Sequence, residues 1–336
     1  MNLRSPRSWV KGILTAVGVL LFFYLVRRIG LKALEANLSR FGPWFLLICL
    51  FGAAYYFLQA WAWWLIQKGF FGKVPLGLLY RIKIISSAFN MVLPSASLGG
   101  DAMRAFMIQK NVPLKEGIPS VLFDKTLEFI ASTAFLIAGF LLGLVTLRLP
   151  KTLTISVIVS LGITATATFF LILAQKTGVK KIVATVASLI PGGKSWVEKR
   201  EIHLEALDQN LRLLYSRSNR KAIFPFALQV FGRLLGTVEV MIIMAVLKAP
   251  VSFIQAIFIC TVVTVGNSIF FILPGQWGVM ESVHILVLQS LGYPAAIGLS
   301  LSVIRRIRSL VFVGLGLILF ASGKRKSPPR KVPDAR

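Results

Sequence analysis

Apolar residues run in long, uninterrupted stretches along most of the chain, separated by short clusters of charged residues. The charge-free runs at 41–67, 152–175 and 249–280 each exceed the roughly 20 residues that a helix needs to cross a bilayer. The pattern predicts eight long helices, at 9–27, 43–67, 78–93, 118–147, 152–175, 222–247, 251–273 and 294–322, and two shorter pieces, at 99–110 and 279–291. We therefore expect an all-α polytopic membrane fold.

The positions of these runs predict a single transmembrane domain over residues 1–323. It contains two halves, 43–147 and 222–322, joined by the run at 152–175 and a basic loop at 176–221 that includes a helix on the membrane surface. Residues 9–27 follow a basic flank and lack a small-x-small cleavage site, so they are expected to stay as a first helix. The basic, proline-rich tail at 324–336 is expected to be disordered.

Composition supports the membrane assignment and narrows the partner. The 336 residues are 56% hydrophobic and only 15% charged, with a mean hydropathy of +0.77, which excludes an ordinary soluble domain. The net charge of +26 comes from basic residues between the apolar runs and at the ends of the chain. That distribution favours anionic lipid over nucleic acid. Cys49 and Cys260 lie inside apolar runs, where we expect small buried residues, and no cofactor or metal site is predicted.

Clusters of Lys and Arg set the expected orientation, because such clusters collect on the cytoplasmic side. The chain start, residues 68–83, the loop at 176–221 and the tail are the most basic segments. All four become cytoplasmic if 78–110 is a hairpin that enters from the cytoplasm and 251–292 is a hairpin that enters from outside. The sequence therefore predicts a multi-pass protein of the inner (cytoplasmic) membrane with both termini cytoplasmic.

Each predicted hairpin contains a similar break, "VLPSASLGGDAMRAFMIQ" from Val92 and "ILPGQWGVMESVHILVLQ" from Ile272. Inverted-topology halves with discontinuous helices build a site near the middle of the bilayer, so Pro94 is expected close to Pro274. The alternative is that both breaks are kinks in full-length helices, since membrane helices tolerate proline.

A helix that begins at a break presents open backbone amides and favours an anion. Asp101 either contributes to the ligand site or caps the short helix itself. Around the two breaks, the predicted substrate-binding residues are Ser95, Ser97, Gly99, Gly100, Asp101, Arg104, Pro274, Gly275, Gly278 and Glu281.

Further charges fall within apolar segments, where each costs about 2.5 to 3.5 kcal/mol at the bilayer centre. The additional predicted site residues are Asp124, Glu128, Arg233, Glu239, Arg305, Arg306 and Arg308. The last three lie roughly 17 to 21 Å from the outer end of their helix and need carboxylates, from Asp124, Glu128, Glu239 or Glu281, or an anionic substrate. Together with Arg104 and Arg233 they form a cationic interior suited to phosphate.

Two of these assignments have alternatives. Lys125 stands between Asp124 and Glu128, so the trio could neutralise itself within one helix. His284 follows Glu281 by three residues, and Asp101, Glu281 and His284 are weak candidates for proton coupling. A hydrogen-bonded histidine on a helix face is the alternative for His284.

The paired motifs resemble those of the lysylphosphatidylglycerol synthase transmembrane region, also called the flippase-like domain family. The resemblance rests on "LPSASLGGDAMRAFMIQK", "SVLFDKTLEF" and "LPGQWGVMESVHILVLQSLG" and covers nearly the whole chain. It implies an inner-membrane protein with re-entrant segments that moves a lipid or lipid-linked intermediate between leaflets. The matching positions are Gly99, Gly100, Asp101, Arg104, Asp124, Pro274, Gly275, Gly278 and Glu281.

The second motif departs from the family pattern at Gln276-Trp277 and at Met280, so a headgroup preference is not carried over. The soluble domain that transfers an amino acid in the full synthase is not expected here, because the chain ends 13 residues after Gly323. Synthase activity is therefore not implied, and no enzyme motif is recognised.

Three hypotheses follow. The first is a transporter that flips an anionic lipid. The second is a non-transporting subunit that presents a lipid to a glycosyltransferase or other lipid-modifying enzyme. The third is a membrane-embedded transferase that uses Asp124 and Glu128, although carboxylates alone name no reaction.

Overall fold

A computed structural model describes residues 41–70, 74–92, 98–147, 151–178, 188, 201, 205, 208–210, 221–269 and 279–323. Its helices are α3 (Pro43–Phe70), α4 (Leu76–Val92), α5 (Leu98–Ile108), α6 (Leu114–Thr146), α7 (Lys151–Thr177), α12 (Ile223–Val246), α13 (Phe253–Ile269), α14 (Val279–Ser290) and α15 (Ala295–Ser322). The predicted all-α polytopic membrane fold is confirmed. The predicted helix at 9–27, most of the basic loop and the tail lie outside the described residues.

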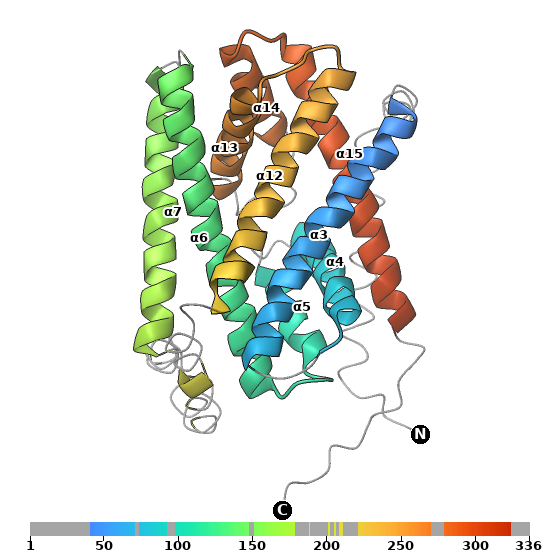
Figure 1. The fold of residues 1–336 in the computed structure, drawn as a ribbon, viewed down its shortest axis with the longest axis vertical. Helices are drawn as coiled ribbons and strands as arrows, with labels where there is room; N and C mark the ends of the chain where they lie inside the picture. The colour runs from blue at the N-terminus through green and yellow to red at the C-terminus, as the bar shows by residue number, and fades with distance from the viewer. Residues whose placement is uncertain are drawn as a thin grey trace, which may run out of the picture.

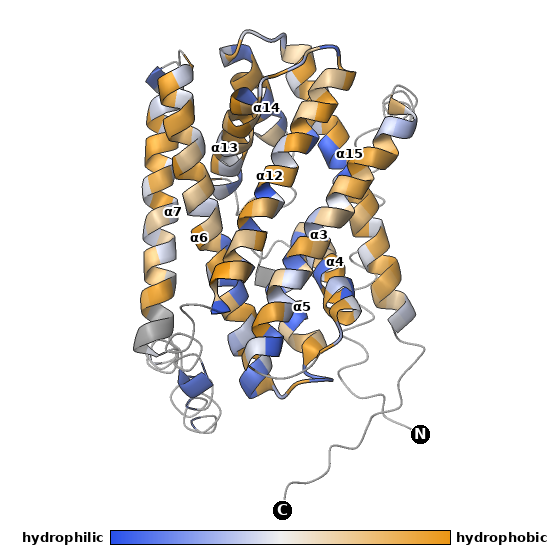
Figure 2. Cartoon of the chain, viewed as in Figure 1, coloured by the Kyte–Doolittle hydropathy of each residue, from blue (hydrophilic) through white to orange (hydrophobic). Residues whose placement is uncertain are grey.

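Long apolar helices form much of the outer surface of the molecule. Three described helices, α3, α6 and α12, are long and apolar enough to cross a membrane. The full-height helices α6 and α7 pack together at one side (Figure 1), and their surfaces are largely hydrophobic (Figure 2). Val145 on α6 is 86% exposed and Phe169 on α7 is 61% exposed. Large exposed apolar surfaces of this kind are suited to contact with lipid.

The helices form two series with the same order of lengths: a long helix, two short ones and a second long one. The first series is α3 to α6 and the second is α12 to α15. Helix α3 packs against α12, α4 against α15, and α13 against α6. Exchanging the two series turns the contact of α4 with α15 into that of α13 with α6 and leaves the contact of α3 with α12 unchanged, as an internal two-fold relation requires.

The short helices of the two series occupy opposite halves of the molecule. Helices α4 and α5 lie in the lower half of Figure 1, whereas α13 and α14 lie in the upper half. That the two hairpins enter the membrane from opposite faces stays a prediction. The breaks at Pro94 and Pro274, and hence their predicted proximity, fall outside the described residues.

Hydrogen bonds join separate helices and loops near the lower and upper ends of the molecule as it is drawn in Figure 1. At the lower end, Lys221 Nζ donates to the carbonyl of Gly69 at 3.2 Å, and Arg81 donates to the carbonyl of Leu319. At the upper end, the Tyr293 hydroxyl donates to the carbonyl of Pro250 at 2.8 Å. The first two bonds join helices of different series, α3 to α12 and α4 to α15, and the third joins two connections within the second series.

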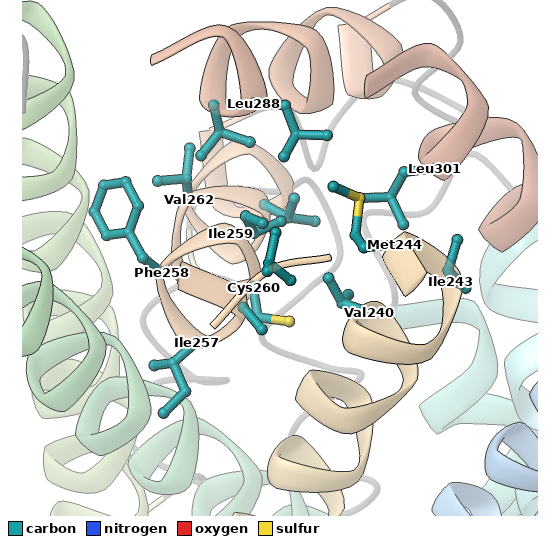
Figure 3. Packing of buried hydrophobic residues seen from close by; sticks show 14 of the residues in the cluster. Val240, Ile243, Met244, Ile257, Phe258, Ile259, Cys260, Val262, Leu288 and Leu301 are labelled. Carbon is teal, nitrogen blue, oxygen red and sulfur yellow. The ribbon is translucent and has the colours of Figure 1, made fainter. Parts of the chain in front are cut away.

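The largest apolar core lies where α12, α13, α14 and α15 converge on α6. Figure 3 shows Val240 and Met244 of α12 on the side of α13 that carries Ile259 and Cys260, whereas Phe258 points to the opposite side of α13. Cys260 is buried there as a free thiol, and Cys49 is also free. This packing fixes α12, α14 and α15, which carry the second group of charges described below.

Candidate functional site

Charged side chains that are buried or partly buried form two groups. The first, called the Asp124 cluster, consists of Lys83, Asp101, Arg104, Asp124, Lys125 and Glu128, together with the uncharged Gln229. The second, called the arginine cluster, consists of Glu239, Glu281, Arg305, Arg306 and Arg308. Nine of the ten charged residues predicted for the site are therefore divided between two clusters, and the tenth is Arg233.

Asp124 is the centre of the first cluster. Its Oδ2 accepts from Lys83 Nζ at 2.7 Å and from Arg104 at 2.5 Å, while Oδ1 accepts from Gln229 Nε2 at 3.1 Å. Asp124 is 0% exposed and Arg104 is 1% exposed. A buried charge without a partner is strongly unfavourable, so this cluster depends on having all its members.

Helix α3 supplies a wall for the Asp124 cluster. The guanidinium of Arg104 lies 4.2 Å from the ring centroid of Trp63, a distance suited to a cation–π contact. The indole N–H of Trp63 donates to Ser120 Oγ at 3.2 Å, and Gln67 donates to the same oxygen at 2.5 Å. Arg104 is thus held by contacts to α3, α5 and α6.

The start of α5 differs from the predicted open anion site. The amide of Gly100 donates to Asn90 Oδ1 of α4 at 2.7 Å, so a protein side chain already satisfies it. A side chain at position 100 would meet Asn90 and the carbonyl of Ser86. Gly100 therefore allows α4 and α5 to approach each other, and the idea that its amide is open to a ligand is wrong.

Asp101 does not act as the predicted helix cap. It lies inside the first turn of α5, where its Oδ1 accepts from Arg104 at 3.1 Å. Its Oδ2 lies 3.7 Å from Lys125 Nζ. The carboxylate is committed to these side chains because they bring positive charge to a buried position.

The trio on α6 is neutralised only in part within its own helix. Lys125 Nζ donates to Glu128 Oε2 at 3.2 Å, as that alternative predicts, whereas Asp124 binds side chains from other helices. Arg233 of α12 donates to Ser132 of α6. Arg233 thus contacts α6 and, within the described part of the chain, takes part in none of these ion pairs.

The arginine cluster lies in the first half of α15. Arg306 lies 2.6 Å from Glu281 Oε1 of α14, and Arg308 pairs with Glu239 of α12. Arg305 Nε is 3.7 Å from the other oxygen of Glu239. Of the four predicted carboxylate partners, Glu239 and Glu281 are found here, whereas Asp124 and Glu128 belong to the other cluster. Asp124 is held there by cations of α4 and α5.

The two clusters share one repeated contact. Lys125 is the twelfth residue of α6, and Arg306 is the twelfth residue of α15. Each pairs with an acid in the first turn of the preceding short helix, Asp101 or Glu281. The internal repeat therefore extends from helix order to charged side chains.

Several predicted site residues lie beyond the described part of the chain, and the sequence analysis missed some residues that contribute to the clusters. Ser95, Ser97, Pro274, Gly275 and Gly278 lie outside it, so their roles stay predictions. The missed residues are Gln59, Trp63, Gln67, Lys83, Ser120 and Gln229. Lys83 lies inside the predicted helix at 78–93, and this position could have identified it. It was instead counted with the cytoplasmic basic residues.

His284 lies beside the arginine cluster on α14. It is 4% exposed, and its Nδ1 is 2.7 Å from the carbonyl oxygen of Met280. The predicted alternative of a hydrogen-bonded histidine on a helix face fits this contact. Its other ring nitrogen, Nε2, is buried and has no hydrogen-bond partner among the described residues.

The family comparison agrees with the helix arrangement and the paired motifs. Residues 9–316 match the family described as the lysylphosphatidylglycerol synthase TM region. Neither a curated protein nor a solved structure matches the chain. The protein belongs to the family of the lysylphosphatidylglycerol synthase TM region, and it is a multi-pass membrane protein with a lipid-related function.

Proposed function

We propose that the protein translocates an anionic lipid, or a lipid-linked intermediate, between the leaflets of the inner membrane. The observation that carries this proposal is the arginine cluster. Among the described residues it holds three cations, Arg305, Arg306 and Arg308, against two carboxylates, Glu239 and Glu281. Ionisable groups within membrane segments mark substrate pathways.

The position of the cluster along α15 supports the proposal. Arg305 to Arg308 are residues 11 to 14 of this 28-residue helix. At about 1.5 Å per residue they stand roughly 15 to 20 Å from its first residue, in a helix about 42 Å long. A guanidinium at that depth is suited to hold a lipid phosphate while the acyl chains remain in the bilayer.

Arg305 is the best candidate to contact the lipid. Among the described residues, Arg305 forms one ion pair, the 3.7 Å contact with Glu239, and its side chain is 21% exposed. Arg308 pairs more closely with the same acid, and Arg306 pairs with Glu281. A phosphate can therefore approach Arg305 with less disturbance of the protein's own ion pairs than at its neighbours.

The Asp124 cluster has a different role in this proposal. Both Asp124 oxygens accept hydrogen bonds from buried side chains, which favours a structural anchor for α5 over an acid that reacts. The proposal therefore includes transport of a lipid and no change to its covalent bonds.

Translocation of a fluorescent anionic phospholipid in proteoliposomes tests the function. Arg305→Gln should slow translocation about tenfold or more, because a charge-assisted contact to phosphate contributes about 1.5 to 3 kcal/mol. Lys221→Gln, which changes a basic residue at the lower end, is the matched control and should keep the wild-type rate. Equal rates for wild type and Arg305→Gln would reject the site.

The same preparation separates the second hypothesis, a subunit that presents lipid to an enzyme. A folded protein that binds anionic lipid but never moves it, and that co-purifies with a lipid-modifying enzyme, would favour presentation. Translocation by the isolated protein would favour the transporter.

A further inference from the structure

Lys83 is a buried lysine near the middle of α4. Its Nζ lies 2.7 Å from Asp124 Oδ2 and donates to Gln59 Oε1 at 3.4 Å, and 7% of the residue is exposed. Asp124 is residue 11 of α6, so the pair lies roughly 15 Å along that helix from its first residue. A lysine ammonium, unlike a guanidinium, can become a neutral amine in a protein. The charge of Lys83 can therefore change.

The hydrogen bonds around Lys83 allow both of its charge states. Asp124 Oδ2 also accepts from Arg104 at 2.5 Å, and Asp124 Oδ1 accepts from Gln229 at 3.1 Å. Asp124 therefore keeps a cationic partner when Lys83 is neutral, and the amine still has N–H groups for Asp124 and Gln59. Loss of this proton thus avoids a buried carboxylate without a cation, which would be strongly unfavourable.

The charges that act on Lys83 come from α5 and α6. The described neighbours are Gln59 and Trp63 of α3, Arg104 of α5, and Asp124 and Glu128 of α6. Helix α15 crosses α4 at Gly316, and its arginines pair with Glu239 and Glu281 instead. The surroundings of Lys83 are therefore uncharged on the side of α3 and charged on the side of α5 and α6.

Positive charge exceeds negative charge by one in this part of the molecule. The described groups are the cations Lys83, Arg104, Lys125 and Arg233 and the anions Asp101, Asp124 and Glu128. Arg104 and Arg233 carry guanidiniums, which stay charged, and Lys125 lies close to two carboxylates. Lys83 shares its one carboxylate with Arg104. Lys83 is therefore the cation whose proton is least needed for charge balance.

Arg233 connects this charge balance with the arginine cluster. Its charge acts on Glu128, and the charges of Arg233, Arg305 and Glu239 all act on Cys260. Arg233 is thus within electrostatic reach of both clusters. A lipid phosphate at the arginine cluster adds negative charge, which favours a proton on Lys83. By linkage, a proton on Lys83 then favours binding of the phosphate.

We propose that Lys83 takes up one proton from water when the anionic lipid binds and returns it to water when the lipid leaves, so that lipid and proton are cotransported. This inference rests on the proposed function, because it concerns what drives the same transport. The proton moves between Lys83 Nζ and water, and no bond of the lipid changes. Of the residues predicted for proton coupling, Asp101 and Glu281 are each paired with an arginine, and His284 is included in the test.

The test is the final distribution of a trace fluorescent phosphodiester lipid between the leaflets of proteoliposomes that hold a gradient of about one pH unit. Valinomycin with equal potassium on both sides keeps the membrane potential at zero. Cotransport of one proton per lipid would enrich the lipid up to about tenfold in the leaflet on the alkaline side. We expect wild type to reach about threefold or more, and vesicles without protein to show no enrichment.

Variants assign the proton to Lys83. Lys83→Arg keeps the positive charge but cannot release a proton, so lipid that moves through it should stay evenly distributed under the gradient. Lys83→Gln removes the charge and should likewise lose the enrichment. Lys125→Arg and His284→Gln, which remove the titration of nearby groups, should keep it. Enrichment that survives in both Lys83 variants, or that is lost in Lys125→Arg or His284→Gln, would overturn the assignment.

The wild-type measurements decide the coupling even if neither Lys83 variant folds. Lipid that moves but stays evenly distributed under the gradient would reject proton coupling and leave translocation of an anionic lipid intact. Enrichment in the leaflet on the acidic side would reject cotransport in favour of exchange. Lipid that does not move with or without the gradient would contradict the proposed function itself.

Discussion

At the scale of single residues, the buried charges act as partners in networks. Lys83 and Arg104 are both within hydrogen-bond distance of one Asp124 oxygen, and neither has more than 7% of its surface exposed. In such surroundings, removing one partner leaves the others buried and unpaired, which is far less favourable than removing a whole network.

Asp124→Asn should therefore destabilise the protein by about 3 to 5 kcal/mol. Unfolding of the purified protein in detergent, followed with temperature or denaturant, measures the loss. Glu128→Gln is the comparison, because Glu128 pairs within its helix and 26% of its side chain is exposed. That change should have an effect of less than about 1 kcal/mol. Similar losses for both variants would contradict the assignment of Asp124 as the anchor.

The sequence identified the charged residues of the membrane segments, but it did not predict which of them form ion pairs with one another. Asp124, Glu239 and the arginines of α15 were all identified, because a charge in an apolar run is conspicuous. Their division into two clusters could not be predicted, since it depends on how α12 packs between the halves. The hydrogen bond from the Gly100 amide to Asn90 Oδ1 could not be predicted either, because it depends on the approach of α4 to α5.

At the scale of helices, close packing in the repeat depends on small residues. A side chain at Gly316 of α15 would lie 2.7 Å from Ala88 Cβ and 2.8 Å from the Ile84 carbonyl of α4. At the equivalent crossing of α6 and α13, a side chain at Gly143 would lie 2.5 Å from the Phe258 ring. Small residues let membrane helices approach closely, and these crossings join each long helix to the opposite hairpin.

Gly316→Val should separate α15 from α4 and destabilise the fold by about 1 to 3 kcal/mol. Denaturant unfolding in detergent measures this change. Gly236→Ala on α12 is the control, because nothing lies within 4 Å of the added carbon. It should be neutral or slightly stabilising, since alanine is the better helix former by about 1 kcal/mol. A Gly316→Val protein as stable as wild type would show that the crossing is loose.

The ion pair between Arg306 and Glu281 joins α15 to α14, so reversing its charges tests that link. Arg306→Glu alone places two acids together and should lower stability by about 3 kcal/mol or more. Combining it with Glu281→Arg should recover part of that loss, because opposite charges again face each other. Thermal unfolding of the two single variants and the double variant gives the coupling. Additive losses would indicate that the contact does not fix α14.

At the scale of the whole molecule, helix boundaries followed directly from apolar runs and breakers. The predicted 222–247 and 294–322 became Ile223–Val246 and Ala295–Ser322, because proline and charge end such runs locally. Helix α6 begins earlier than predicted, at Leu114, because Pro119 is accommodated inside it. The packing of α3 against α12 across the repeat joins distant segments, which apolar periodicity does not report.

The positions of the helix ends allow the orientation of the protein in the membrane to be tested. In Figure 1, α12 ends and α15 begins at the upper end, while α5 ends and α6 begins at the lower end. The positive-inside rule predicts that the lower end is cytoplasmic. Asn111 after α5 and Ala296 at the start of α15 are both exposed, so each can carry a reporter cysteine once Cys49 and Cys260 are replaced by serine.

A membrane-impermeant maleimide should label Ala296→Cys in intact spheroplasts, because the upper end faces outward. Asn111→Cys should react only after the membrane is permeabilised, since the predicted hairpin returns to the cytoplasm before α6. Labelling after denaturation in detergent controls for expression of both variants. The reverse pattern would invert the whole molecule. Labelling of both positions from outside would instead show that α4 and α5 do not form a hairpin open to the cytoplasm. That result would contradict the inverted repeat, on which a lipid pathway open to both sides depends.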